Sequence, residues 1–587
     1  MKQLSGVDAS FLYMESASQF GHVTGLSIFQ RPDEPGWSAY DAFRRTLERR
    51  LPVLEPLRRR VVEVPLELDH PYWIEDPDFD LDYHLRETAV PPPGDDGRLA
   101  DVVARIIGRP LDRAHPLWEA YVIEGLSGDR FAVMTKIHHA TIDGASGTEL
   151  MTILFDVDPD AEEGPPVADD RRPEPVPSQA EVLARVAADV VRKPGKLARL
   201  QVRSLRAIGE LTRNRGLVGL AEVARSFPNP MVRRHPSSPE PDQAPPPPRA
   251  SAPPTPLNRS ISPHRRLSLR TASLADVKAI KNATGATLND VVMAVCAGAL
   301  RCYLDGHDAL PDRSLVAMIP VSIRTGDEEE RWTNRVSAIF APIPTNEPDP
   351  LQRISAVHAA METAKDRFTL LPADMLTDYA QFSPPALATR AIRLATRLRV
   401  ADRLNPPFNL VISNVPGPRE PLYLAGARLL HYYPVSTITE GQGLNITVQS
   451  YLDSLDFGLV ACRDLVPDLE HLADLLLAEI EALARACGAT LSAAPAPSAN
   501  GSTAGVASPV VATAEAAPAK KRATSTKRSP KAAPSKSAPA KATKRTTQKA
   551  KPVKATKRAT KKTAKATTAT KKTAKATRKA APRARRP

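Results

Sequence analysis

Two stretches of this chain alternate strand-like and helical patterns, and a proline-rich segment separates them. Residues 1–160 contain the runs GLSIFQ (25–30) and RFAVMTKI (130–137), and residues 261–490 contain runs such as NLVISNV (409–415). Apolar residues at every second position predict half-buried strands, whereas apolar residues at steps of three and four predict helices. Strands mixed with helices in both stretches predict an α/β (α+β) fold with two layers of similar design.

The segment 161–260 begins and ends with proline-rich stretches, which are typical of extended linkers. Between residues 196 and 213, basic residues recur at steps of three and four, and leucines fill the opposite face. Such a basic amphipathic helix either lies on an anionic lipid surface or packs on the protein body with its basic side in water.

Residues 491–587 form a tail of low complexity that is rich in Lys, Ala and Thr. Because it has little apolar surface to offset the entropy of ordering, we expect it to be disordered. The stretch from Lys520 onward holds 26 of the 80 Lys and Arg and no Asp or Glu; the rest of the chain keeps 54 basic against 66 acidic residues, a net charge of −12. A strongly basic tail binds phosphate groups, either those of nucleic acid or those of anionic lipid.

The four cysteines form no C-x-x-C pair, which favours reduced thiols in a cytosolic protein. The first residues, MKQLSGVDASFLYMES, lack the apolar core of a secretory signal. The longest apolar run, VVMAVCAGAL (291–300), is too short to cross a bilayer. We therefore expect a cytoplasmic protein whose contact with a membrane is peripheral.

The segment KIHHATIDGASG (136–147) joins a strand-like run to the helical run GTELMTILF. His138, His139, Asp143 and Gly144 therefore lie in or next to a turn between a strand and a helix, where side chains are held firmly yet stay accessible.

Three roles fit two adjacent histidines. They could ligate a metal, but neighbours at the end of a strand point to opposite faces, and no third ligand is spaced nearby. They could be ordinary structural histidines. One of them could be a general base, an imidazole that takes a proton from an alcohol at neutral pH. Asp143 would then brace the turn, and Gly144 would let the chain bend.

HHATIDG resembles the HHxxxDG signature of CoA-dependent acyltransferases, which include chloramphenicol acetyltransferase and peptide-synthetase condensation domains. Further motifs in sequence order narrow the resemblance to the bacterial wax ester synthase/acyl-CoA:diacylglycerol acyltransferase family over residues 4 to 480. They are LSGVDASFLYMES (4–16), FDLDYHLR (79–86), RAHPLWE (113–119), GATLNDVVMAV (285–295), PVSIR (320–324) and SNVPGP (413–418). The tail is not part of the core domain of that family.

The resemblance implies two chloramphenicol-acetyltransferase-like domains with an active-site tunnel between them. It also implies that His139 is the catalytic base, acting on the hydroxyl of a diacylglycerol or a long-chain alcohol that then attacks acyl-CoA. Neither a cofactor nor a metal is needed, since acyl-CoA is a substrate. His138 would support the turn, and Asp143 would be structural.

The resemblance also nominates residues for the substrate path, each with a plainer alternative. Asn289 would donate to the oxyanion, or it would cap a helix. Trp118 would line the acyl channel, or it would be a buried aromatic of the core. Glu15 belongs to the amino-terminal motif, although a lone glutamate is usually solvated. Ser413 and Asn414 would end a strand near the tunnel, or they would begin a rigid turn.

The implied products are triacylglycerol or wax esters, and lipid substrates favour a membrane or lipid-droplet surface over nucleic acid as the partner of the tail. Two rival functions remain at this stage. One is another HHxxxDG acyltransferase of the condensation or polyketide type. The other is a non-catalytic protein that binds a nucleoid or a membrane through its tail.

Overall fold

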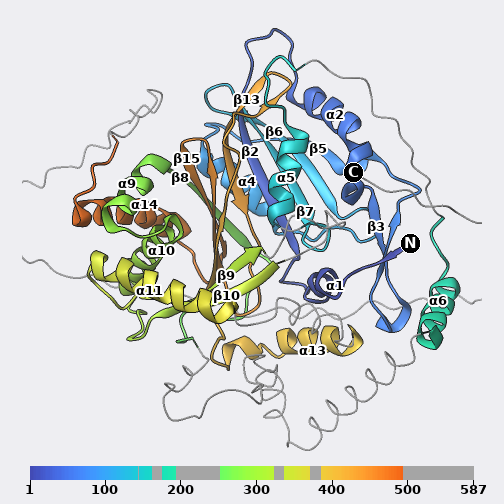
Figure 1. Cartoon of the computed structure of the whole chain (residues 1–587). Helices are drawn as coiled ribbons and strands as arrows, with labels where there is room; N and C mark the ends of the chain where they lie inside the picture. The colour runs from blue at the N-terminus through green and yellow to red at the C-terminus, as the bar shows by residue number, and fades with distance from the viewer. Residues whose placement is uncertain (143, 162–174, 193–251, 323–335, 370–384, 493–587) are drawn as a thin grey trace, which may run out of the picture. The chain divides into compact units, whose positions relative to one another are not determined.

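The chain folds around two large β-sheets with helices packed against them (Figure 1). The computed structural model describes residues 1–142, 144–161, 175–192, 252–322, 336–369 and 385–492. In these residues the first sheet has the strand order β12-β13-β2-β7-β6-β5, and the second has the order β10-β9-β11-β14-β15-β8.

The first sheet consists of β2 (His22–Gln30), β5 (Leu85–Ala89), β6 (Trp118–Leu126), β7 (Arg130–His138), β12 (Tyr423–Leu424) and β13 (Ala427–Val435). The second consists of β8 (Arg265–Ser273), β9 (Leu315–Ser322), β10 (Val336–Ile343), β11 (Leu410–Val415), β14 (Leu444–Tyr451) and β15 (Ser454–Cys462). A small third sheet holds β1 (Lys2–Gln3), β3 (Arg59–Val62) and β4 (Tyr72–Glu75). Neighbouring strands are antiparallel, except that β5 runs parallel to β6 and β11 runs parallel to both β9 and β14.

Helices cover the sheets on several sides. The α-helices in the first part of the chain are α1 (Gly6–Tyr13), α2 (Ala39–Arg50), α3 (Leu81–His84), α4 (Asp96–Ile107), α5 (Gly144–Leu154) and α6 (Gln179–Arg192). Those in the second part are α9 (Leu274–Thr284), α10 (Leu288–Asp305), α11 (Pro350–Thr369), α13 (Pro385–Arg397) and α14 (Leu469–Cys487). Short 3-10 helices are η1 (Leu51–Val53), η2 (Glu55–Leu57), η3 (Pro65–Glu67) and η4 (Val400–Asp402).

The first sheet is apolar on both faces. On one face Phe29, Phe131 and Val133 pack against α2 and α5. On the other face Leu26 and Ile28 pack against α4, in a cluster that also contains Leu267 of β8 and Val460 of β15. The alternation of Ile28 and Phe29 between the two faces follows from the two-residue period of a strand. Helix α4 therefore connects the core of the first sheet to the second sheet.

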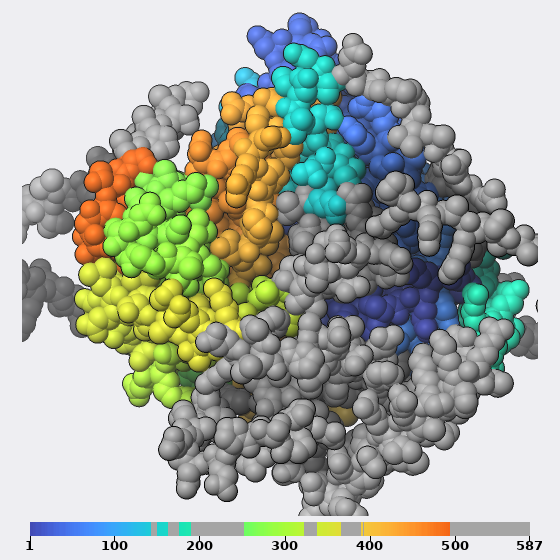
Figure 2. All heavy atoms as spheres, in the orientation of Figure 1, coloured from blue at the N-terminus to red at the C-terminus, as the bar shows by residue number. Residues whose placement is uncertain are grey.

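The second sheet packs against α9, α10, α11 and α14, which gather on one side of the chain in Figure 1, and the surface of this side is seen in Figure 2. Helix α10 is almost entirely buried among them, which fits its continuous apolar sequence. Helix α9 ends at Gly285, whose φ of 71° is the left-handed conformation that glycine adopts at helix ends.

Strands β12 and β13 come from the second half of the chain yet belong to the first sheet, where β13 pairs antiparallel with β2. The buried carboxylate of Asp456, on β15 of the second sheet, holds this crossover. It accepts hydrogen bonds from the Tyr432 N–H of β13 (2.9 Å) and from the Thr271 hydroxyl of β8 (2.7 Å). A Cβ on Gly458 would lie 1.9 Å from the Pro434 carbonyl oxygen, so glycine permits the close approach of β15 to β13.

The expected mixed α/β fold is confirmed, and the strand-like runs of the sequence are strands. The simple division into domains 1–160 and 261–490 misses the crossover of β12 and β13. The expected helix at 196–213 and the tail from 493 onward lie outside the described residues. All four cysteines are free.

In the part of the chain that the structure describes, no single helix has the length and apolar character needed to cross a membrane. Helices α9 and α10 meet that test only when taken together, as a pair bent by 100°.

Candidate active site

The two histidines of the HHATIDG segment lie at the end of β7, a strand between β2 and β6 in the first sheet. His138 is the last residue of β7, and its N–H donates to the Leu117 carbonyl (2.9 Å). The His139 N–H donates to the carbonyl of Gly21 (2.7 Å), just before β2. Both backbones are therefore fixed before the chain turns into α5, which begins at Gly144.

The ring of His138 is buried, with 1% of the residue exposed. Its Nδ1 accepts a hydrogen bond from the Ala140 N–H (3.0 Å), so the ring hydrogen of the neutral form lies on Nε2. Nε2 lies 3.3 Å from Oε1 of Glu15, within ion-pair distance. Both ring nitrogens thus face protein groups, as expected of a supporting residue.

Glu15 connects His138 to the amino-terminal helix and to the loop before β6. Its Oε1 accepts from the Gly21 N–H (2.8 Å), and its Oε2 accepts from Nη2 of Arg113 (2.8 Å). Burial by itself would raise the pKa of the Glu15 carboxyl, but interactions with His138, Gly21 and Arg113 outweigh burial and hold this pKa at about 2. Glu15 is therefore an anion at neutral pH.

Gly21 is required by the close approach of His138. A Cβ at this position would lie 2.5 Å from Nε2 of His138, a distance that the buried ring cannot accommodate without moving. The same residue donates to Glu15 and accepts from the backbone of His139. Gly21 thus contacts both histidines and the carboxylate.

His139 differs from its neighbour because it is only half-buried. Its ring stacks on Phe11 of α1, with ring centroids 4.3 Å apart and planes within 3°. This stacking fixes the plane of the imidazole while part of the residue stays exposed. In the residues that the structure describes, no group of His, Cys, Asp and Glu is arranged to hold a metal ion.

We expect Glu15→Gln to lower the free energy of unfolding by about 2–3 kcal/mol at pH 7, because a carboxylate with a pKa near 2 loses its favourable charge. A depressed pKa stabilises the fold above the unfolded value of about 4.3, and this stabilisation is lost as the pH falls through the folded value. The free energy of unfolding, measured by urea denaturation, should therefore differ less between wild type and variant as the pH falls from 5 to 2. Glu87→Gln, at an exposed glutamate of β5, is the control and should show no such difference.

Other residues nominated from the sequence lie in several places. Trp118 is buried, its Nε1 donates to the Leu57 carbonyl (2.7 Å), and its ring stacks on His84 at 4.4 Å. These are the contacts of a core residue, and a role in an acyl channel stays a prediction. Ser413 and Asn414 are half-buried in β11, beside β14. Asp143 lies outside the described residues.

Asn289 is the second residue of α10 and is half-buried. The alternative that it caps this helix is wrong, because Thr287 is the cap. The Thr287 hydroxyl accepts from the Asp290 N–H (3.2 Å), and the Asp290 carboxylate accepts from the Thr287 N–H (2.9 Å), a complete capping box. Asn289 stays the predicted oxyanion donor.

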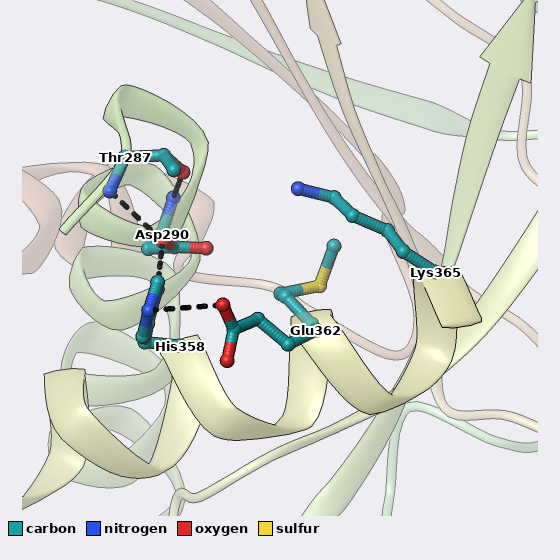
Figure 3. A pocket seen from close by; sticks show the side chains of 6 residues that line it. Thr287, Asp290, His358, Glu362 and Lys365 are labelled. Carbon is teal, nitrogen blue, oxygen red and sulfur yellow. Dashed lines mark hydrogen bonds and ion pairs between the residues drawn. The ribbon is translucent and has the colours of Figure 1, made fainter. Parts of the chain in front are cut away.

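A cavity of about 350 Å³ opens between the start of α10 and α11 (Figure 3). Asp290 lies on its wall, where one carboxylate oxygen accepts from Nδ1 of His358 (2.8 Å). The hydrogen bond to Asp290 raises the pKa of His358, although solvation of the exposed ring limits its effect on stability. Lys365 and Glu362 line the same cavity. Asp290, which follows Asn289 in the sequence, therefore links α10 to α11 through its hydrogen bond with His358.

Reasoning from the sequence missed three contributors to the site: Phe11, Gly21 and Arg113. Phe11 and Arg113 lie within the segments LSGVDASFLYMES and RAHPLWE, so the signal was present, but a motif does not say which of its members meet in space. Glu15 and Arg113 are 98 residues apart in the chain.

Comparison with known proteins decides the family. Residues 4–292 match the wax ester synthase/diacylglycerol acyltransferase catalytic domain, and residues 332–484 match the WS/DGAT C-terminal domain. The chain belongs to the wax ester synthase/diacylglycerol acyltransferase family. It is an acyltransferase.

Relatives and a solved structure agree with this family. A putative diacylglycerol O-acyltransferase of Mycobacterium tuberculosis strain CDC 1551 is 36% identical over 476 residues, which are 81% of this chain and 88% of the relative. A second from the same strain is 38% identical over 493 residues, 83% of this chain and all of the relative. The solved wax ester synthase/diacylglycerol acyltransferase from Marinobacter aquaeolei VT8 is 29% identical, with a TM-score of 0.57 over 83% of this chain and 100% of that structure.

Proposed function

We propose that this acyltransferase moves a long-chain acyl group from acyl-CoA to the hydroxyl of diacylglycerol, with His139 as the general base. The contrast between the two histidines carries the proposal. His138 is buried, with both ring nitrogens against protein groups, whereas His139 is half-buried and held flat against Phe11. Diacylglycerol is the favoured acceptor because the relatives at 36% and 38% identity are described as diacylglycerol O-acyltransferases.

The reaction needs one base and one oxyanion donor. His139 takes the proton of the acceptor hydroxyl while the oxygen attacks the thioester carbon, and the tetrahedral intermediate then expels CoA as the thiolate. The imidazolium returns the proton to the thiolate sulfur. Because the acceptor oxygen itself attacks the thioester, no acyl-enzyme forms. Asn289 donates to the developing oxyanion. Nδ1 of His139 is buried, which favours Nε2 as the nitrogen that meets the hydroxyl.

Competition between acceptors tests this proposal. Purified protein is incubated with radiolabelled palmitoyl-CoA and equal amounts of diacylglycerol and hexadecanol, and the products are separated by chromatography. We expect labelled triacylglycerol as the main product, with one free CoA thiol per ester formed. Wax ester as the main product would assign the alcohol as acceptor, and release of free fatty acid alone would overturn the proposal.

A further inference from the structure

An exposed apolar projection lies on the connection between β3 and β4. Leu66 is 74% exposed and Leu68 is 53% exposed, so two large apolar side chains face water two residues apart. Leu66 and Glu67 of η3 have φ values of 60° and 55°, a left-handed conformation that residues other than glycine rarely adopt. Leu66 is thus exposed in a backbone conformation that costs free energy.

Helix α13 packs against η3, and its sequence carries several arginines. Arg390, Arg393, Leu394 and Arg397 recur at steps of three and four and are all exposed, so they share the outer face of the helix. Leu394 is 43% exposed.

The acidic neighbours of this face offset part of its charge. Nη1 of Arg393 lies 3.8 Å from Glu67, and Asp69 lies on the same connection as the leucines. Arg390 and Arg397 make no ion pair within the part of the chain that the structure describes. These two guanidinium groups lie on the helix that packs against the leucine-bearing connection. They suit phosphate headgroups that lie above acyl chains, because guanidinium binds phosphate through paired hydrogen bonds.

This face is also connected to the candidate active site. Helix α13 packs on α1, and Phe11 of α1 stacks on His139. The proposed face is therefore one helix away from the residue that stacks on the proposed base. Three separated leucines cover too little area for a stable protein–protein interface, which needs about 800 Å² per partner.

We propose that Leu66, Leu68 and Leu394, with Arg390 and Arg397, dock the enzyme on a phospholipid bilayer, where the leucines enter the acyl region and the arginines bind lipid phosphates. This inference rests on the proposed function in so far as the acceptor is a lipid.

The test uses the full chain, sonicated vesicles of pure phosphatidylcholine and co-sedimentation. Vesicles without net charge minimise the attraction of the basic tail, which every variant retains. We expect Leu66→Asp/Leu68→Asp to lower the vesicle partition coefficient at least about tenfold. The matched control is Val157→Asp/Leu351→Asp, which places the same two charges at exposed apolar residues elsewhere. It should retain the wild-type partition.

Acyl transfer from palmitoyl-CoA to dissolved 1-hexanol separates the two proposals. We expect the Leu66/Leu68 variant to keep its hexanol activity while its partition falls. The proposed docking surface would be overturned if the vesicle partition coefficient of the Leu66/Leu68 variant were unchanged, or if that of the control variant fell equally. Either result would count whatever the hexanol activity. Absence of acyl transfer by the wild type to any acceptor would overturn the proposed function and leave the partition result to be judged by itself.

Discussion

We expect His139→Ala to lower kcat/KM for palmitoyl-CoA and diacylglycerol by about 10²–10⁴-fold, because alanine cannot accept the hydroxyl proton. The loss should lie in kcat more than in KM, since the base acts in the transition state rather than in substrate binding. Stability should change little, because the ring contacts Phe11 on one side and keeps part of its surface exposed. The measurement is the initial rate of CoA thiol release together with the melting temperature.

His138→Ala is the matched control, since it removes the same ring from the neighbouring position. We expect this variant to retain measurable activity but to lose stability, because the change leaves a cavity in a buried site and removes a partner of Glu15. Equal and complete loss of activity in two well-folded variants, or near wild-type activity in His139→Ala, would contradict the assignment of the base.

The second large effect is expected at a buried ion pair between α11 and α14. Arg353 is 2% exposed and Glu479 is 8% exposed, and Nη2 of Arg353 donates to the Glu479 carboxylate. The carboxylate lies over Gly298 of α10, where a Cβ would come within 2.2 Å of it. Removing one partner leaves the other charge buried and uncompensated, so we expect Glu479→Ala to lower the free energy of unfolding by about 3–5 kcal/mol.

Two further variants make this prediction specific. Glu481→Ala removes an exposed carboxylate from the same helix, which pairs only with Arg485 at 3.6 Å among the described residues, and should cost less than about 1 kcal/mol. Arg353→Met/Glu479→Met removes both charges at similar volume and should recover most of the loss. Urea denaturation followed by circular dichroism measures all three. A double variant as unstable as Glu479→Ala would mean that packing, and not the isolated charge, causes the loss.

Local features of the fold could be predicted from the sequence. The period-two run RFAVMTKI is strand β7, and the helix closed by Gly285 is α9, because side-chain alternation and a left-handed glycine are properties of neighbouring residues. The position of HHATIDG between a strand and α5 could also be predicted, from the strand-like run before it and the helical run after it.

Pairings between distant segments could not be predicted in this way. Local periodicity identifies GLSIFQ (25–30) as strand-like, but it does not say that β13, about 400 residues later, is the strand that pairs with it. The contact between Glu15 and Arg113 could not be predicted either, because it depends on two loops that are far apart in the sequence meeting in space. The cap of α10 is a smaller example: both Thr287 and Asn289 are good capping residues, and the register of the helix decides for Thr287.

The crossover of β12 and β13 sets a rule for exchanging parts between relatives. A chimera that takes residues 1–160 from one parent and the remainder from another would pair β2 with a β13 from the other parent. Residues 423–435 should therefore come from the same parent as residues 1–160. The set of residues that must be exchanged together is thus discontinuous in the sequence.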